Sequence, residues 1–236
     1  MPSPKKIAAI QSSYIPWKGY FDIINEVDEF VLYDDVQYTK KNWRNRNRIK
    51  SQSGSQWLSI PVIYKSRDQN IQDIVVTNDI WKKKHWRAIK YNYQGAKYFQ
   101  DHKDFFEDLY LGTEENFLSK INYRFLTAIC KILNIQTKIS FSKDFDLTEG
   151  KTKRVIELCK QAGATEFLSG PVAKPYLDEQ LLAKEGISLI WKDYSGYPEY
   201  DQLYPPFDHY VTVLDVIFNC GPESPNYIWG MKSQSG

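Results

Sequence analysis

The densest group of side chains capable of chemistry lies between residues 34 and 50. Two adjacent aspartates, Asp34 and Asp35, precede a basic run that reads KKNWRNRNRIK. A carboxylate can accept a proton or hold a hydroxyl group, and an arginine fork binds phosphate through paired N–H groups. The stretch therefore predicts a phosphate-binding cradle, with an RNA-binding patch and a solvated basic face as the alternatives.

Arginine and asparagine alternate within the basic run. In an extended segment Arg44, Arg46 and Arg48 would line one face, because successive side chains point to opposite sides. Asparagine suits hydroxyl and amide groups, and the tryptophan of the run would stack on bases if the ligand were RNA. The candidate ligand-binding residues of the run are Asn42, Trp43, Arg44, Arg46, Asn47 and Arg48.

A second candidate region, QSSYIPWKGY, comes earlier in the chain. It begins at the end of the apolar run of residues 6–11 and contains a proline and a glycine ahead of a predicted helix. In α/β proteins such a strand-to-helix loop is a common ligand site, and the helix N-terminus favours phosphate. The sequence has neither a Walker A motif nor GxGxxG, so position alone selects the candidates Gln11, Tyr14, Lys18, Gly19 and Tyr20.

Two further strand-to-helix loops occur in the second half of the chain, in EGKTKR and in LSGPVAKPYL. Cations at the start of a helix oppose its dipole unless an anion is nearby, so the first loop predicts a phosphate contact. The second loop does not match GxSxG, and Ser169 is predicted to hydrogen-bond a ligand rather than to act as a nucleophile. The candidates are Lys151, Lys153, Arg154, Ser169, Gly170 and Lys174.

The candidates for proton transfer are Asp34, Asp35 and His209. His209 lies just before an apolar segment, where Asp208 or Asp215 could orient it as a base. His85 and His102 lie among charged residues and are predicted to be solvated. The three cysteines are widely spaced and form no metal-binding pattern, which argues against structural zinc, and Cys220 is predicted to be a buried thiol. Whether any other metal is required stays open.

The apolar pattern predicts the elements that must position these residues. Strands are expected over residues 6–11, 29–34, 57–63, 71–77, 138–142, 166–168 and 188–191. Helices are expected over residues 20–27, 81–93, 103–110, 113–134, 151–162, 172–184 and 211–218, with Thr113 as a cap. The alternation predicts an α/β fold with a parallel, Rossmann-like sheet and an inserted or C-terminal helical part.

Length and composition limit the overall organisation. The 236 residues predict one α/β domain over residues 1–230, or two lobes divided between residues 64 and 137, and a disordered tail over 231–236. A net charge of +2 argues against a dedicated nucleic-acid binder. The absence of a long apolar run and the cysteine pattern predict a cytoplasmic protein without a membrane span. The aromatic content of 15% permits a homodimer.

Five motifs together resemble the WbqC-like family. They are IQSSYIPWKGYFDII, FVLYDDVQYTKKNWRNRNRIK, WLSIPV, FLSGPVAKPYL and VLDVIFNCG, in the order that the family shows. The resemblance covers nearly the whole chain, and one departure is Ser12-Ser13, where the family has Pro-Ser or Pro-Tyr. Because the family is associated with bacterial O-antigen and other surface-polysaccharide gene clusters, the resemblance implies work on nucleotide-activated sugars.

The resemblance further implies N-acylation of a nucleotide-linked amino sugar, with the acyl group coming from an amino acid such as glycine activated by ATP, or from a thioester. The basic residues would hold phosphate, a proton-transfer candidate would deprotonate the amine, and Asn47 or the backbone of Gly19 or Gly170 would stabilise the oxyanion. The first alternative is a nucleotidylyltransferase acting on a sugar phosphate, by fold-level analogy to pantothenate synthetase. In that analogy Trp17 and Tyr20 replace the histidines of the HxGH-type loop. The second alternative is a non-catalytic RNA- or partner-binding module.

Overall fold

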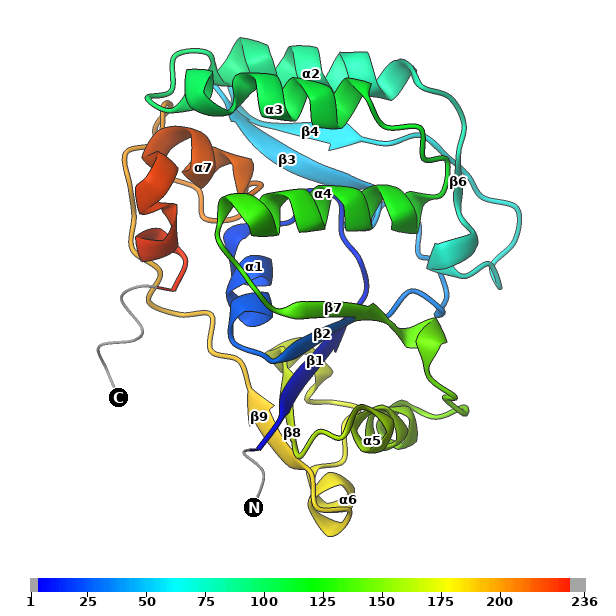
Figure 1. Cartoon of the computed structure of the whole chain (residues 1–236). Coiled ribbons are helices and arrows are strands. Elements are labelled where there is room, and N and C mark those ends of the chain that lie inside the picture. The colour runs from blue at the N-terminus through cyan, green and yellow to red at the C-terminus, as the bar shows by residue number, and fades with distance from the viewer. Residues whose placement is uncertain (1–3, 230–236) are drawn as a thin grey trace. The chain divides into compact units, whose positions relative to one another are not determined.

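The computed structural model of the protein describes residues 4–229, so the tail predicted to be disordered, residues 231–236, lies outside the described residues (Figure 1). The chain forms two compact units. Within the described residues, the first comprises residues 4–11, 23–35 and 135–195, and the second comprises residues 12–22, 36–134 and 196–229. The segments of the two units alternate along the chain, and helix α1 (Lys18–Asn25) begins in the second unit and ends in the first.

The first unit, called the sheet unit below, contains a five-stranded parallel sheet. Its strands are β1 (Lys6–Ile10), β2 (Glu29–Leu32), β7 (Lys138–Phe141), β8 (Glu166–Ser169) and β9 (Ser188–Trp191). They lie in the order β7-β2-β1-β8-β9, and every pairing between them is parallel (Figure 1). Counted along the chain this order is 3-2-1-4-5, as in Rossmann-type nucleotide-binding sheets. The predicted parallel α/β fold is confirmed.

Helices α5 (Lys151–Ala162) and α6 (Glu179–Lys184) also belong to the sheet unit. Leu158 of α5 packs with Ile7 and Phe167 of the sheet in one apolar core. The single helix predicted over residues 172–184 is wrong. Pro171–Ala173 forms only a short 3₁₀ turn, and α6 begins after Asp178. Pro175 between them has no N–H to donate and its ring would clash with the preceding turn, so a continuous helix cannot form there.

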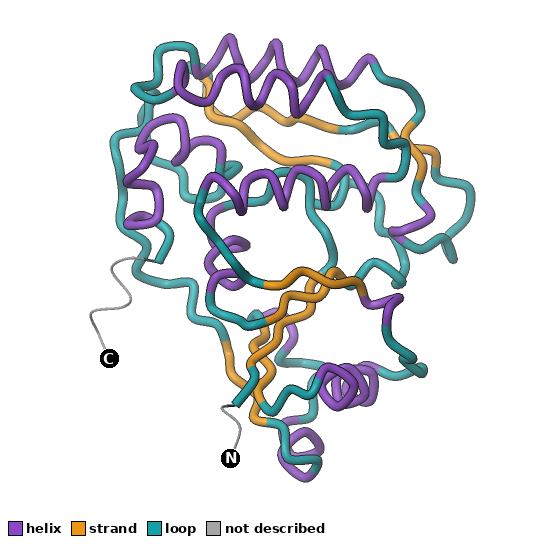
Figure 2. Tube along the Cα trace, viewed as in Figure 1, coloured by secondary structure: helices purple, strands orange, loops and turns teal. Residues whose placement is uncertain are grey.

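The second unit, called the helical unit below, combines short antiparallel strand pairs with four helices among its described residues. Strands β3 (Arg46–Ser51) and β4 (Gly54–Ser59) form a hairpin, and β5 (Val62–Ile63) pairs with β6 (Val75–Val76). The helices are α2 (Ile80–Tyr93), α3 (Phe99–Leu111), α4 (Leu118–Ile132) and α7 (Leu214–Cys220). Helices α2 and α3 run side by side next to the hairpin (Figure 1), and a long loop, residues 196–213, precedes α7 (Figure 2).

Two predicted elements of the helical unit differ in the structure. The helix expected from Thr113 begins only at Leu118, because residues 116–118 pair with the chain around β6: Val76 N donates to Asn116 O at 2.9 Å and Leu118 N donates to Ile74 O at 2.8 Å. The strand expected over residues 57–63 is divided between β4 and β5, and β4 begins three residues earlier, at Gly54, as one arm of the hairpin.

His85 was expected in solvent, and this prediction is wrong, because His85 lies in the aromatic core of the helical unit. Its Nε2 lies 3.2 Å from Ser59 O, so Nε2–H donates there and Nδ1 accepts from Tyr14 Oη at 2.9 Å. Tyr14 Oη also lies 2.7 Å from Tyr110 Oη. Burial lowers the pKa of His85 to about 4, which keeps the imidazole neutral. Tyr14, a candidate ligand-binding residue, is therefore fully buried.

Candidate functional site

One face of the β3–β4 hairpin carries basic and aromatic side chains. Arg48 is directly opposite Trp57, and Arg46 precedes it by two residues on the same side of the strand. The guanidinium carbon of Arg46 lies 4.2 Å from the Trp57 ring centroid, and that of Arg48 lies 5.7 Å away. The ring of Trp43, just before the hairpin, lies 5.4 Å from the ring of Trp57. Trp43, Arg46, Arg48 and Trp57 are called the arginine–tryptophan face below.

The two arginines of this face differ in their partners. Arg48 Nη2 donates to Tyr210 O at 3.2 Å and lies 4.0 Å from Asp208 Oδ2. Among the described residues, no carboxylate pairs with Arg46 and no acceptor receives a hydrogen bond from it, and its Nε is buried without a partner. Arg46 therefore presents a positive charge without a counterion beside an exposed aromatic ring.

Lys18, the first residue of α1, is buried rather than directed at solvent. Its Nζ donates to Pro198 O at 3.2 Å and lies over three aromatic rings, at 5.1 Å from the centroid of Tyr197, 5.3 Å from Tyr200 and 5.7 Å from Phe207. Aromatic faces attract a desolvated ammonium group. Burial lowers the pKa of Lys18 to about 8, against the opposing attraction of nearby acidic groups. Lys18 is therefore a caged internal cation, not an open phosphate ligand.

His209 lies next to this cage. Its ring is 4.6 Å from the ring of Phe207, and its Nδ1 is buried without a hydrogen-bond partner in the described structure. Burial first, and then the positive charge of Lys18, lower the pKa of His209, while Glu199 and Asp208 oppose the change. The imidazole is neutral near pH 7 and can accept a proton. The expected orienting hydrogen bond from Asp208 or Asp215 is not formed.

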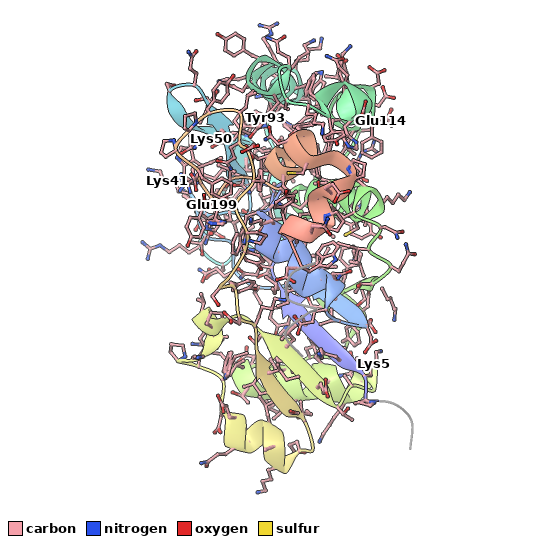
Figure 3. The ribbon with its side chains drawn as sticks, turned by 90° about the vertical axis from the view of Figure 1, so that its left-hand side faces the viewer. Lys5, Lys41, Lys50, Tyr93, Glu114 and Glu199 are labelled. Atoms are coloured by element: carbon pink, nitrogen blue, oxygen red, sulfur yellow. The ribbon has the colours of Figure 1, made fainter. Side chains whose placement is uncertain are left out.

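Asp215, at the start of α7, instead fixes the loop that carries His209. Its carboxylate accepts hydrogen bonds from Tyr93 Oη at 2.9 Å, from Tyr200 Oη at 2.8 Å and from Gln202 Nε2 at 3.0 Å. Lys50 lies beside Tyr93 (Figure 3), where its backbone N donates to Tyr93 Oη, and its Nζ donates to Pro206 O. These bonds hold residues 200–206 in place, and this segment includes or adjoins two of the rings around Lys18, those of Tyr200 and Phe207.

Part of the basic run turns inward and clamps the loop of residues 12–17. Arg44 Nη1 donates to Ser12 O at 2.9 Å and to Ser13 Oγ at 3.1 Å. The side-chain amide of Asn47 donates to Tyr14 O at 3.1 Å and to Ile15 O at 2.7 Å. Arg44 and Asn47 therefore position this loop, and neither side chain is part of the arginine–tryptophan face.

The remaining candidates of the helical unit also have structural contacts. A Cβ on Gly19 would lie 2.3 Å from the Trp17 ring, so the close approach of that ring explains the glycine. Tyr20 is buried, and Asn42 Oδ1 accepts a hydrogen bond from Trp43 N at 2.7 Å. Asn42 thus fixes the backbone of Trp43 at the edge of the arginine–tryptophan face.

The candidate residues of the sheet unit lie near the carboxyl ends of its strands. Asp35 Oδ2 lies 2.6 Å from Arg154 Nη2, and Asp35 Oδ1 accepts from Ser142 Oγ at 2.5 Å. Arg154 Nε also donates to Tyr33 Oη at 2.5 Å. This group joins β2, β7 and α5, so Asp35 acts as an anchor within the sheet unit. Asp34 beside it is buried.

Gln11 directly follows β1 and Ser169 ends β8, and these are the two strands between which the direction of the sheet order reverses. Open parallel sheets bind ligands at that point, so these residues mark a second candidate ligand site. Gly170 lies next to Tyr194. Lys151 lies 4.9 Å above the ring of Tyr176, Lys174 lies 5.6 Å above that of Trp191, and Lys153 is 3.9 Å from Glu157.

Trp57 is a functional candidate that was missed from the sequence, because it was assigned only as the first residue of an expected strand. The serines at positions 55 and 59 share its phase along β4, while Leu58 and Ile60 occupy the other phase. That alternation places Trp57 on the polar side of the strand, and it could have been used to predict the exposure of Trp57 from the sequence. Trp57 is 44% exposed and Trp43 is 43% exposed.

Some classes of site are not found in the described part of the chain. Within residues 4–229, histidine, cysteine and acidic side chains do not gather in any group of three or more that could hold a metal ion. No helix in that range combines the length and apolar character needed to cross a bilayer. The three cysteines are free and buried, which confirms the prediction for Cys220.

The fold and the candidate sites define an α/β protein with a parallel sheet of strand order 3-2-1-4-5. Its helical unit holds a lysine buried among aromatic rings and carries the exposed arginine–tryptophan face. The chain belongs to the WbqC-like protein family, which matches residues 11–227. It is 47% identical over 225 residues to uncharacterized protein Rv1507c of Mycobacterium tuberculosis, covering 95% of this chain and 97% of that protein. No solved structure matches the chain significantly.

Proposed function

We propose that this protein is a cytoplasmic enzyme that N-acylates a nucleotide-linked amino sugar during surface-polysaccharide assembly. The observation that carries the proposal is His209, a neutral imidazole whose Nδ1 has no hydrogen-bond partner among residues 4–229, and whose pKa responds to both Lys18 and Asp208. A base of this kind suits the deprotonation of an amine, and Arg46 on the arginine–tryptophan face suits a substrate that carries phosphate.

The proposed reaction forms one bond and breaks one. The amine nitrogen of the sugar attacks the acyl carbonyl carbon, and His209 takes the proton that the nitrogen loses. The bond from that carbon to the leaving group then breaks, and its electron pair leaves with AMP from an acyl-adenylate or with the thiol of a thioester. His209 is preferred over Asp35, because one ring nitrogen of His209 has no partner in the described structure, whereas the carboxylate of Asp35 accepts a hydrogen bond from Arg154.

The test is amide formation followed by mass spectrometry. Purified protein is incubated with dTDP-4-amino-4,6-dideoxyglucose and either ATP with single amino acids or acyl thioesters. The proposal expects a mass gain equal to the transferred acyl group. His209→Gln should lower the rate at least about a hundredfold. His102→Gln, on α3, is the matched control and should retain the rate. No mass gain with any donor would contradict the proposal.

A second candidate function is a nucleotidylyltransferase that acts on a sugar phosphate. The 3-2-1-4-5 strand order of the sheet unit favours it, since this order is shared by nucleotide-binding sheets. Release of pyrophosphate that depends on a sugar phosphate and a nucleoside triphosphate, without amide formation, would support this function over N-acylation.

A further inference from the structure

The contacts of Arg46 leave its N–H groups without an acceptor among the described residues. Its guanidinium carbon lies 4.2 Å from the centroid of the Trp57 ring. A contact with an aromatic ring supplies no lone pair, so the guanidinium can still donate hydrogen bonds to a ligand. In the described part of the chain, Arg46 has no carboxylate partner, whereas Arg48 is near Asp208. A cation that is held in place and lacks a counterion is a binding site for an anion.

The two tryptophans of the same face are both exposed in part. Trp43 is 43% exposed and Trp57 is 44% exposed, although both rings are in contact with each other at 5.4 Å. A nucleobase stacks on such a surface because each of its faces is a flat π system. The hairpin ladder holds Trp57, and the hydrogen bond from Trp43 N to Asn42 holds the backbone of Trp43.

We propose that the arginine–tryptophan face binds the nucleoside diphosphate part of the substrate, with the base against the Trp43–Trp57 pair and the diphosphate on Arg46. The inference deepens the proposed N-acylation by naming the part of the substrate that this face recognises. The inference rests on the proposed function only in assuming that the bound nucleotide carries an amino sugar. The face is small, with a single exposed tryptophan pair, which suits one nucleotide better than a nucleic-acid strand.

Binding measurements on the full chain separate the two contacts. Isothermal titration is carried out with dTDP, UDP, thymidine and pyrophosphate. Trp43→Ala should weaken dTDP and thymidine binding about tenfold each, because the stacked base loses its partner. Trp43→Phe should restore most of the affinity. Arg46→Gln should weaken dTDP and pyrophosphate binding about tenfold and leave thymidine binding unchanged.

Matched controls come from helix α2 of the same unit. Arg87 and Tyr91 are exposed there, and Tyr91 is 73% exposed. Arg87→Gln and Tyr91→Ala should leave the affinity for dTDP unchanged. Thermal unfolding of every variant shows whether a loss of affinity comes from unfolding, and the selective effect of Arg46→Gln on phosphate-bearing ligands cannot arise that way.

The outcomes distinguish this inference from the function on which it rests. Binding of dTDP or UDP that the face variants weaken, without any acyl transfer, would support the inference and contradict the proposed function. Acyl transfer with dTDP affinity unchanged in Trp43→Ala and Arg46→Gln would overturn the inference alone. A single-stranded RNA oligonucleotide that binds more tightly than dTDP, with steep salt dependence, would overturn it in favour of RNA binding.

Discussion

Among single residues, His209 and Lys18 form the pair with the clearest electrostatic consequence. The positive charge of Lys18 lowers the pKa of His209 in addition to the larger effect of burial. Replacing the ammonium by a side chain of similar length therefore removes the charge but keeps most of the burial. We predict that Lys18→Met raises the pKa of His209 toward its ordinary value of 6.5.

This prediction is checked by NMR titration of the imidazole C–H signals, which is practical because the chain has three histidines. His85 is the internal control: burial lowers its pKa to about 4, so its signal should not titrate between pH 5 and 8 in either protein. An unchanged titration of His209 in Lys18→Met would show that the ammonium does not act on the imidazole.

Asp35 is the residue whose role changes most between sequence and structure. Its place after a predicted strand makes Asp35 a candidate base, whereas its carboxylate is 2.6 Å from Arg154 Nη2 and accepts a hydrogen bond from Ser142 Oγ. We predict that Asp35→Asn lowers the free energy of unfolding by about 1–2 kcal/mol, since a partly buried, charge-assisted pair is lost. Urea titration measures this change, and Asp104→Asn, at a highly exposed position, is the control. Loss of acyl transfer at unchanged stability would instead give Asp35 a chemical role.

At the scale of elements, the loop of residues 12–17 is held by the chain that leads into β3. Ile15 has a φ of 36°, a left-handed conformation that is rare for a β-branched residue, and it is fully buried. Such a conformation persists only when the surroundings determine it. The two hydrogen bonds from Asn47, at 3.1 and 2.7 Å, supply that constraint.

We predict that Asn47→Ala destabilises the protein by about 2–4 kcal/mol, because two buried carbonyl groups lose their donors. Asn116→Ala, at an exposed position before α4, should change the stability little. Chemical denaturation followed by circular dichroism measures both. Equal stability of Asn47→Ala and wild type would mean that the loop keeps its conformation without the clamp.

The same loop shows why part of the site could not be predicted from the sequence. The alternation of the basic run correctly placed Arg46 and Arg48 on one side of a strand, because period 2 is a local property. Arg44 follows the same alternation but lies before β3 and bonds the 12–17 loop. Its direction depends on a partner 32 residues away, which no local pattern contains. The burial of His85, in contrast, could have been predicted from the local sequence. Trp81, His85 and Ile89 are spaced by four along α2, so they lie on one side of the helix.

At the scale of the whole molecule, the alternation of strands and helices was enough to predict the parallel sheet. It was not enough to predict that the candidate residues divide between two units. Lys18 and Arg46 belong to the helical unit, whereas Asp35, Arg154 and Ser169 belong to the sheet unit. The division follows from which segments share a core, and segments that share a core here are more than a hundred residues apart in the chain.

The stability of the molecule in acid should depend strongly on Glu29. This carboxylate begins β2, its side chain is 1% exposed, and it lies 2.7 Å from Lys5 Nζ and 3.0 Å from Lys138 Nζ. Burial alone would raise the pKa of Glu29, but the hydrogen bonds from Lys5, Ser140 and Lys138 and the charge of Lys5 together outweigh burial and lower it below 4.5. The unfolded chain therefore binds a proton at higher pH than the folded protein does.

The sign of the pH dependence follows from this order of proton binding. The contribution of Glu29 is complete above pH 4.5, the ordinary pKa, and is lost as the pH falls through the lower folded-state value. We predict that Glu29→Gln costs about 1–2 kcal/mol at pH 7 and flattens the acid limb of a plot of unfolding free energy against pH. The control Glu185→Gln removes a solvent-exposed pair with Lys160 and should change the curve little, since exposed pairs contribute little. Parallel acid limbs for Glu29→Gln and wild type would assign the acid sensitivity to other carboxylates.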